Sequence, residues 1–384
     1  MRKHRIAGAL AAVAGASLML AGSVSAQSPS APAAAGSPGT GSTWKIGVVP
    51  DIGTLDDKNY NEYTNKGAQA GAAAIGAAVP DAVVPKSADE YKADIQNFVD
   101  NGYNLIVTTG FNLAGDTAQA AHDNPKVWFV GVDQSPICVD EQGNADPNFG
   151  CKGDAKTLLP NYISIEYQED QAGYLAGIVA ASVSKTGSIA AIGGTDACAP
   201  CVRYIQGYEL GAKSVNPNIK VNSAYVVHDF STAAFNDPTT GATFAQQLLT
   251  TYPDTDVIFQ VAGKTGNGVL ATACAAKIAG IGVDVDQYVS LNSATDPTYG
   301  CVITSAEKHL VSTVSQAIEA IAGGTAVAGD SLYNAANDGI GVADFHGAAV
   351  PADVQAKLDA ALAAMKATPP LVTCPADSCG VVAK

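Results

Sequence analysis

From Lys45 onward, the sequence alternates short runs of apolar and β-branched residues with longer, alanine-rich amphipathic stretches. Runs that are apolar at successive positions are typical of strands buried on both faces, and intervening helices imply right-handed crossovers between parallel strands. The predicted strands are Lys45–Val49, Leu105–Thr109, Val127–Val132, Ser188–Ile192, Val221–Val227, Val257–Val261 and Gly280–Val283. The predicted helices are Glu62–Ile75, Tyr91–Asn101, Gly115–His122, Asp170–Val183, Val202–Val215, Thr243–Thr251 and Asn267–Lys277. The predicted fold class is therefore α/β, with doubly wound parallel sheets.

The pattern extends over about 340 residues, more than one hydrophobic core usually serves, so we predict two lobes. The segments 45–132 and 188–283 each run strand, helix, strand, helix, strand, and each ends in an Asp-Gln pair, in "VGVDQ" and "IGVDVDQ". Ligands of open α/β sheets bind beyond the carboxyl ends of the strands. We therefore expect Asp51, Asp133 and Asp286 to meet at a cleft shared by the two lobes.

The first residues have the pattern of a secretory signal peptide. A basic start is followed by an apolar run and by the small residues Val24, Ser25 and Ala26, so residues 1–26 are expected to be removed. Residues 27–43 are rich in Ser, Pro, Gly and Ala and are expected to form a disordered linker. Ser23 stands where a lipid-bearing Cys would follow Leu-Ala-Gly. We expect an extracytoplasmic protein, secreted or associated with the cell surface, without a lipid anchor.

The charge of the chain argues against two classes of partner. Without Arg2, Lys3 and Arg5, 18 of the 21 basic residues remain against 36 acidic ones, a net charge of about −18. Such a protein repels phosphate backbones and anionic lipid, so neither nucleic acid nor a membrane surface is expected as a ligand.

The eight cysteines are close together in pairs along the chain, which suggests local disulfides, although many other connectivities are possible. The motif "CAPC" at 198–201 follows an apolar strand and precedes a helix, so it superficially matches a thioredoxin-like redox site. A small strapped loop is the favoured interpretation, because nothing else in the sequence supplies a pathway for substrate thiols.

The polar groups at the predicted strand ends suit a neutral ligand. An ionised Asp accepts hydrogen bonds from two vicinal hydroxyls or from an N–H edge, and Tyr60, Phe111 and Phe259 could stack on a flat ring. Together they predict capture of a polyhydroxylated, aromatic molecule such as a nucleoside. The alternatives are structural: Asp51 could cap a helix, although Asp56 or Asp57 is better placed, and Phe259 could belong to the core.

Enzyme signatures are weak. "GKTGNGV" at 263–269 lacks the residue order of a phosphate-binding loop, the five histidines have no zinc spacing, and no G-x-S-x-G motif occurs. Paired carboxylates for glycoside hydrolysis stay open at this point. We expect a binding protein, not an enzyme, with no cofactor and no metal.

Several motifs resemble one known family. "DIGTLDDKNYN" is similar to the opening signature of the basic membrane protein family of substrate-binding proteins. The resemblance continues in order over about 44–327, through "DIQNFVDNGYNLIVTTGF", "YLAGIVAASVSKTGSIAAIGG", "VIFQVAGKTGNGVL" and "VITSAEKHL". It implies a type I periplasmic-binding-protein fold, with two α/β lobes joined by a three-strand hinge. The implied lobes are residues 44–136 plus about 300–328 (N-terminal) and 137–299 plus about 329–384 (C-terminal).

The resemblance also implies a function and its residues. Family members bind purine nucleosides or related ligands for ABC importers, so a nucleoside-like small molecule, a membrane permease partner and a monomeric state are expected. The residues that match family binding positions are Asp51 and Asp133 for the base, Tyr60 and Phe259 for ring stacking, Asp286 and Lys308 for ribose, and Gly263 for a backbone contact. Three departures from the family are the insertion at 137–158 with its Cys138–Cys151 staple, the loop "TDACAPCVRY" and the missing lipid-bearing Cys.

Three other functions remain compatible with these residues. The same cleft could belong to a ligand sensor that passes lobe closure to a receptor. An exported nucleoside hydrolase could use the carboxylates, and a thiol oxidoreductase could use Cys198 and Cys201.

Overall fold

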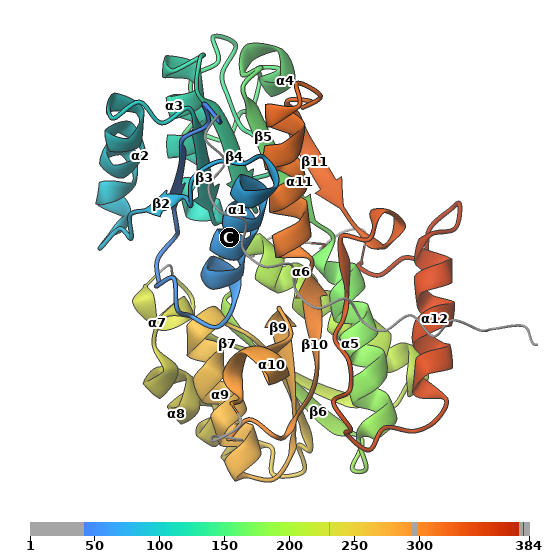
Figure 1. Ribbon diagram of the computed structural model, residues 1–384. Helices are drawn as coiled ribbons and strands as arrows, with labels where there is room; N and C mark the ends of the chain where they lie inside the picture. Colours follow the sequence, from blue (N-terminus) through green and yellow to red (C-terminus); the bar gives the residue numbers. More distant parts are fainter. Residues whose placement is uncertain (1–41, 230, 294–297, 376–378, 380–384) are drawn as a thin grey trace, which may run out of the picture. The chain divides into compact units, whose positions relative to one another are not determined.

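The computed structural model describes residues 42–229, 231–293, 298–375 and 379, and Figure 1 shows its helices and strands. The predicted signal peptide (1–26) and the predicted linker up to residue 41 lie outside the described residues. Within the described ranges, no helix combines the length and the apolar character that a membrane span requires.

The strands form two six-stranded sheets, which confirms the predicted α/β class. The first sheet has the order β11 (Gly329–Tyr333), β5 (Tyr162–Tyr167), β4 (Trp128–Val132), β3 (Leu105–Thr109), β1 (Ile46–Val49) and β2 (Asp81–Ala82). The second has the order β12 (Ile340–Val342), β10 (Val302–Lys308), β9 (Ala279–Asp284), β8 (Val257–Val261), β6 (Ser188–Thr195) and β7 (Lys220–Val227). Neighbouring strands are parallel except for the edge strand β12, which is antiparallel to β10.

Helices cover both faces of each sheet. The α-helices are α1 (Tyr60–Ala74), α2 (Tyr91–Asp100), α3 (Ala114–Asp123), α4 (Ala155–Leu158), α5 (Glu169–Val183), α6 (Ala199–Val215), α7 (Thr232–Phe235), α8 (Pro238–Thr251), α9 (Gly263–Ala275), α10 (Gln287–Leu291), α11 (Leu310–Ala322) and α12 (Val354–Met365). Short 3-10 helices occupy Ala88–Glu90, Phe111–Leu113 and Ala335–Asn337. In the first sheet, Val48 and Val107 pack toward α1 and α11, whereas Val49 and Ile106 pack toward α2 and α3. In the second, α5 and α6 cover one face, and α8 and α9 cover the other.

The chain passes between the sheets three times. The crossings lie between β5 and β6, between β10 and β11, and between β11 and β12. Backbone hydrogen bonds tie the crossing segments together, from Gln168 N to Tyr333 O (2.9 Å) and from His309 N to Gly339 O (3.0 Å). This arrangement is the three-strand connection that the family resemblance implies.

The sheets divide the chain differently from the predicted lobes. Strand β10 was expected with residues 44–136 but pairs in the second sheet, and β5 and β11 were expected in the C-terminal lobe but pair in the first. Strand β5 was absent from the predicted strands. Its sequence, YISIEY, has polar residues at Ser164 and Glu166, and it directly follows the cysteine-containing insertion, so no continuous apolar run marks it.

The four disulfides join cysteines that are neighbours in sequence, as their spacing suggested. They are Cys138–Cys151, Cys198–Cys201, Cys274–Cys301 and Cys374–Cys379. Bonds of this kind stabilise a fold by restricting the unfolded chain, and the longer the loop that they close, the larger the effect. Cys274–Cys301, with a sequence separation of 27, closes the longest of these loops.

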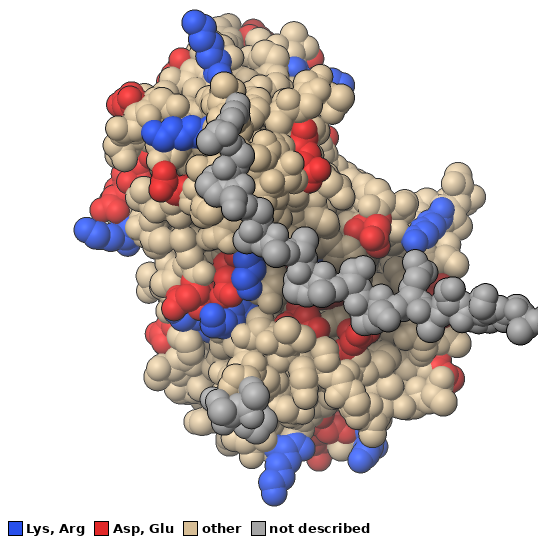
Figure 2. All heavy atoms as spheres, in the orientation of Figure 1, with Lys and Arg blue, Asp and Glu red and all other residues tan. Residues whose placement is uncertain are grey.

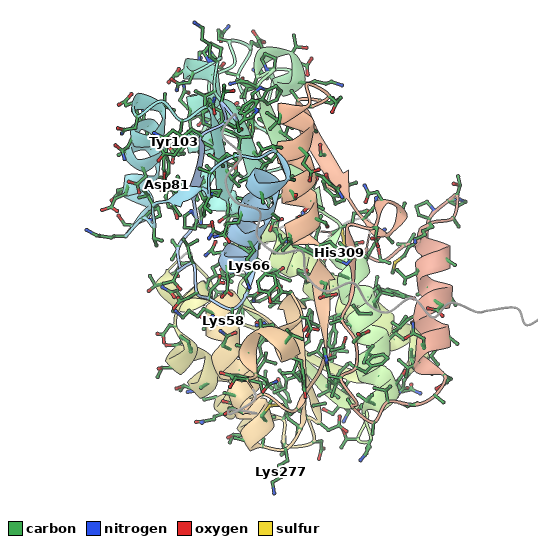
Figure 3. The ribbon with its side chains drawn as sticks, viewed as in Figure 1. Lys58, Lys66, Asp81, Tyr103, Lys277 and His309 are labelled. Atoms are coloured by element: carbon green, nitrogen blue, oxygen red, sulfur yellow. A yellow bond between two sulfur atoms is a disulfide. The ribbon has the colours of Figure 1, made fainter. Side chains whose placement is uncertain are left out.

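Charged side chains are scattered over the face seen in Figure 2, where red and blue groups often adjoin. On α1, Glu62 pairs with Lys58 (3.2 Å) and with Lys66 (2.8 Å), the two lysines labelled in Figure 3. These pairs are exposed and local, so they contribute little to the free energy of unfolding.

Candidate functional site

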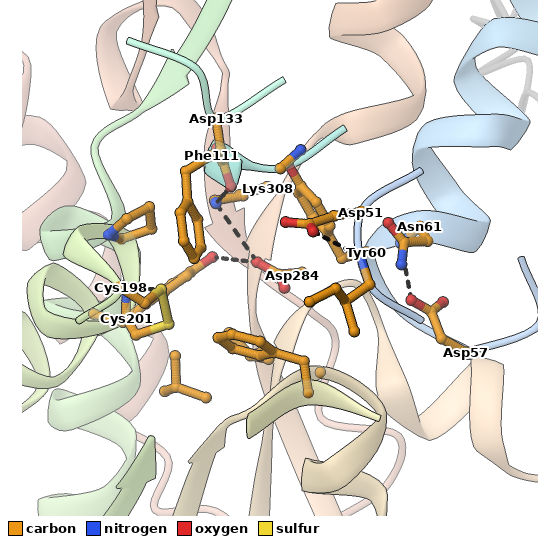
Figure 4. Close-up of a pocket in the computed structure, with 18 residues that line it drawn as sticks. Asp51, Asp57, Tyr60, Asn61, Phe111, Asp133, Cys198, Cys201, Asp284 and Lys308 are labelled. Carbon is orange, nitrogen blue, oxygen red and sulfur yellow. Dashed lines mark hydrogen bonds and ion pairs between the residues drawn. A yellow bond between two sulfur atoms is a disulfide. The ribbon is translucent and has the colours of Figure 1, made fainter. Parts of the chain in front are cut away.

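A pocket lies where the carboxyl ends of strands from both sheets approach one another (Figure 4). It contains about 640 Å³ of space not filled by atoms, part of which is open to solvent. The lining residues are Asp51, Ile52, Asp57, Tyr60, Asn61, Gly110, Phe111, Asp133, Cys198, Pro200, Cys201, Tyr204, Phe235, Val261, Gly263, Val283, Asp284 and Lys308.

Asp51, just beyond β1, is held by an unusually full set of donors. Its carboxylate accepts hydrogen bonds from the Tyr91 hydroxyl (2.5 Å), the Ile52 amide (2.6 Å) and the Asn112 side chain (3.1 and 3.2 Å). Burial raises the pKa of Asp51, and these hydrogen bonds oppose that rise. Gly110 makes the arrangement possible, because a Cβ there would lie 2.3 Å from Asp51 Oδ2. Asp51 therefore stays fixed at the pocket wall.

Asp57 has the capping role that was considered for Asp51. Its carboxylate accepts hydrogen bonds from the backbone amides of Asn59 (2.9 Å), Asn61 (2.9 Å) and Glu62 (3.1 Å), at the start of α1. A carboxylate at a helix N-terminus satisfies free amides and interacts favourably with the helix dipole. The acidic loop before α1 thus serves two purposes, since Asp57 starts the helix and Asp51 faces the pocket.

A buried charge cluster connects the two sheets at the floor of the pocket. Lys308, at the end of β10, contacts Asp133 Oδ2 (2.5 Å), Glu169 Oε1 (2.9 Å) and Asp284 Oδ1 (3.9 Å). Glu169 also pairs with the Arg203 guanidinium at 2.7 Å. Only 2% of the Lys308 side chain is exposed, and burial opposes its charge, but the three carboxylates raise its pKa above the usual value.

Two aspartates of this cluster differ in their available hydrogen-bonding capacity. Asp133 Oδ1 is buried and has no hydrogen-bond partner among the described residues. Asp284 accepts a hydrogen bond from the Tyr204 hydroxyl at 3.2 Å, and burial raises its pKa to about 7. A buried acceptor without a donor is costly, so Asp133 Oδ1 is a natural position for a donor group of a ligand.

Aromatic rings reach the pocket from both sheets. Tyr60 and Phe111 come from the side of the first sheet, and Phe235 and Tyr204 come from that of the second. The rings of Phe111 and Phe235 have their centroids 6.4 Å apart at an interplanar angle of 71°. The Tyr60 hydroxyl donates to Val132 O (3.0 Å) and accepts from Gly110 N (3.1 Å), so its polar end is satisfied by backbone.

Five of the seven residues predicted for the site line this pocket: Asp51, Tyr60, Asp133, Gly263 and Lys308. The placement expected for the other two is wrong. Phe259 lies inside β8, fully buried against the rings of Tyr204 and Tyr208. Asp286 caps α10 by accepting from Val289 N (3.1 Å), and it contacts His346 Nε2 (2.7 Å).

Asp284 occupies the pocket position that was expected for Asp286. Both Asp133 and Asp284 directly follow or end a strand and have a positive φ, 57° and 63° respectively. The shared signal in the sequence is Gly-Val-Asp, present in both "VGVDQ" and "IGVDVDQ", and it aligns Asp133 with Asp284. The Asp-Gln pair used for the prediction instead aligns two buried glutamines, Gln134 and Gln287.

The sequence is similar to one protein family and to characterised relatives over most of its length. Residues 45–367 match the family described as "ABC transporter substrate-binding protein PnrA-like". The chain is 27% identical over 330 residues to the "CD4+ T-cell-stimulating antigen" of Listeria innocua, covering 82% of this chain and 84% of the relative. It is 30% identical over 254 residues to the "ABC transporter nucleoside-binding protein BmpA" of Lactococcus lactis, covering 63% and 64%.

Solved structures of solute-binding proteins have the same fold. A protein of an ABC transporter system from Conexibacter woesei has a TM-score of 0.63 at 22% identity, covering 86% of this chain and 98% of that one. A solute-binding protein from Aeropyrum pernix has a TM-score of 0.63 at 23% identity, covering 78% and 76%. At these identities the likeness concerns the fold alone.

Proposed function

Because the chain belongs to the PnrA-like family of ABC transporter substrate-binding proteins, which are extracytoplasmic and not enzymes, we propose that it binds a nucleoside-like ligand and presents it to an ABC permease. The observation that carries the proposal is the pairing, in one pocket, of aromatic rings from both sheets with Asp133 Oδ1, an acceptor that has no donor in the part of the chain that the structure describes. A nucleoside has a flat ring that can stack on these aromatic rings, and it has N–H or hydroxyl groups that can donate to Asp133 Oδ1.

The charges of the pocket favour an uncharged ligand. Four aspartates line it, against one lysine that is already paired with carboxylates. A phosphate group would add negative charge to a buried region that is already rich in carboxylates, so nucleotides should bind weakly. An uncharged nucleoside avoids this repulsion and still satisfies the acceptors.

Ligand binding would favour a closed arrangement of the two lobes. A molecule that contacts Asp133 and Phe111 on one side, and Phe235 and Asp284 on the other, gains all its contacts only when both walls are close. It therefore shifts the population toward closure by its difference in affinity for the two arrangements. The permease would recognise that closed form.

The proposal is tested by thermal shift and calorimetry with inosine, guanosine, adenosine and uridine, and with hypoxanthine, D-ribose and inosine monophosphate for comparison. At least one nucleoside should raise the melting temperature, because it binds only the folded chain, and the monophosphate should not. A protein that responds to none of the nucleosides, or to ribose alone, would refute the proposal.

The Asp133→Asn substitution tests the acceptor directly. Asparagine keeps an acceptor oxygen but loses the negative charge, and a hydrogen bond to a charged group is worth about 1 kcal/mol more than one to a neutral group, so the nucleoside Kd should rise about tenfold. Asp254→Asn, at an exposed position, is the matched control and should leave the Kd unchanged. Equal affinities of the two variants would remove Asp133 from the site.

A further inference from the structure

One disulfide forms part of the pocket wall. Cys198 and Cys201 both line the pocket, together with Pro200 between them, and Figure 4 shows their sulfur–sulfur bond facing the same space as Phe111 and Asp284. The sequence favoured a plain loop staple for this motif. A loop staple alone does not explain why this disulfide lines the pocket.

Local structure fixes this disulfide at the start of α6. Cys198 is the N-cap residue, and its sulfur accepts a hydrogen bond from Cys201 N at 3.2 Å. Helix α6 is in turn pressed against α5, since a Cβ on Gly211 would lie 1.9 Å from Tyr174 O. The body of α6 is therefore closely packed against α5, and its first turn is closed by the covalent bond.

The strand that leads into this turn, β6, packs against another wall of the pocket. Gly194, at the end of β6, touches α7, where an added Cβ would lie 2.5 Å from Ala234 O and 2.7 Å from the Phe235 ring. Phe235 faces Phe111 across the pocket. Farther along α6, Tyr204 donates its hydroxyl to Asp284. The turn therefore lies between β6, which packs against an aromatic wall of the pocket, and α6, which carries the donor to Asp284.

We propose that the Cys198–Cys201 disulfide is a functional part of the ligand site and a site of thiol–disulfide exchange. In the oxidised form it holds the turn that joins β6, which packs against Phe235, to α6, and its reduction by a dithiol weakens ligand binding. This inference rests on the proposed function for the identity of the ligand, but not for the location of the exchange site.

The exchange step is balanced by the dithiol itself. One thiolate of the dithiol attacks a sulfur of the pair, breaks the Cys198–Cys201 bond, releases the other cysteine as a thiolate and forms a mixed disulfide. The second thiol of the reagent then attacks the reagent's own sulfur in that mixed disulfide and displaces the remaining protein cysteine. Two electrons and two protons pass to the protein, which gains two thiols, and the reagent becomes a disulfide.

Access to the pair should depend on the ligand. Cys198 and Cys201 are only 2% and 5% exposed, and they face the pocket, so a reagent has to approach through it. A bound ligand blocks that approach. Linkage also requires that, if reduction weakens ligand binding by a given factor, the ligand opposes reduction by the same factor.

The experiment compares the native protein with the variant Cys198→Ser/Cys201→Ser. The matched control is Cys374→Ser/Cys379→Ser, which removes another short-loop disulfide, with a sequence separation of 5, from residues that do not line the pocket. Calorimetry with inosine and guanosine should give a Kd at least tenfold higher for the first variant and unchanged for the control. On treatment with dithiothreitol, alkylation of Cys198 and Cys201, followed by mass spectrometry, should slow at least tenfold when the nucleoside is saturating.

A measurement without ligand keeps this proposal separate from the proposed function. Hydrogen–deuterium exchange of residues 232–235 should be faster in Cys198→Ser/Cys201→Ser than in the native protein, and unchanged in the control. If nucleosides bind no form of the protein but exchange still rises, the proposed ligand is wrong and the disulfide retains its role in the wall. Unchanged exchange at 232–235, or an unchanged nucleoside Kd in a variant that is folded, would overturn the inference.

Discussion

Asp284 faces the pocket because the backbone turns sharply where β9 ends. Its φ of 63° is in the left-handed region, in which Asp is tolerated better than most residues. Two residues later, Asp286 has already begun α10 and accepts the amide of Val289. Asp284 is thus a candidate ligand acceptor, whereas Asp286, only two residues later, is a helix cap.

We predict that Asp284→Asn weakens nucleoside binding and that Asp286→Asn does not. Asp284→Asn should raise the nucleoside Kd by about tenfold or more, because one acceptor of hydroxyl groups becomes a poorer one. Asp286→Asn should leave the Kd nearly unchanged, since Asn is also a good N-cap residue. Calorimetry on both variants checks this, and a loss of affinity confined to Asp286→Asn would contradict the assignment.

The pKa of Asp284 predicts a pH dependence of stability. Burial raises this pKa to about 7 from 3.8, so between these values the folded chain binds more protons than the unfolded chain. The contribution of Asp284 to the free energy of unfolding is therefore full below about pH 4 and is lost as the pH rises toward 7. Urea unfolding from pH 4.5 to 8 should show the native protein losing stability relative to Asp284→Asn across this range. If the free energies of unfolding of the two proteins changed in parallel with pH, this contribution of Asp284 would be excluded.

The residues that were misplaced from the sequence show what a pattern cannot resolve. Phe259 lies in a strand that is buried on both faces, so its sequence gives no sign of which face each side chain occupies. Phe235 lies in the four-residue helix α7, which is too short to show a helical period. By contrast, Asp51 and Tyr60 lie in a polar loop and at a helix start, where a family motif fixes their position.

At the scale of elements, α5 and α6 depend on glycines where they meet. Cβ atoms on Gly173 and Gly177 would lie 2.1 Å from the carbonyl oxygens of Tyr204 and Tyr208, and those on Gly207 and Gly211 would approach α5 equally closely. These are backbone atoms, which cannot rotate away. The contact brings α6, and with it the start of the Cys198 turn, to a defined position beside the pocket.

Gly211→Ala should therefore destabilise the protein, although alanine is the better helix former. Forcing the helices apart typically costs about 1–3 kcal/mol, which exceeds the gain of up to about 1 kcal/mol in helix propensity. Gly115→Ala in α3 is the matched control, because an added Cβ there meets nothing within 4 Å, and it should be neutral or stabilising. Chemical denaturation checks both, and equal stability of the two variants would show that α5 and α6 can move apart freely.

The repeated strand and helix pattern was predictable because buried parallel strands are continuous apolar runs. All seven predicted strands correspond to observed strands. The elements that were missed, β5, β11 and β12 among them, are edge strands or contain polar residues. Their pairing partners are distant in sequence, so sheet membership could not follow from local pattern.

At the scale of the molecule, the loop before α1 contacts the helices of the second sheet. Lys264 donates to Thr54 Oγ1 (3.0 Å), Asn267 donates to Asp57 O (3.0 Å), and Ser290 donates to Lys58 O (2.7 Å). These bonds join the two sides of the pocket without lining its floor. They would be broken by any motion that separates the sheets at this edge.

Lys264→Met should weaken nucleoside binding without removing a proposed acceptor of the ligand. Loss of one such bond, worth about 0.5–1.5 kcal/mol, should raise the Kd by up to about tenfold, because the closed arrangement becomes less favourable. The control is Lys277→Met, the same change just beyond the other end of α9, where Lys277 points outward (Figure 3). Calorimetry measures the affinity, and an identical Kd for both variants would show that this contact plays no part in closure.

The order of strands also has a consequence for synthesis. The outer strand of the first sheet, β11, is encoded after every strand of the second sheet except β12. A chain that leaves a ribosome or a translocation pore from its N-terminus therefore exposes β5 as an open edge until Tyr333 has emerged. Open edges recruit wrong partners, so the nascent protein should need a holding chaperone most during that interval.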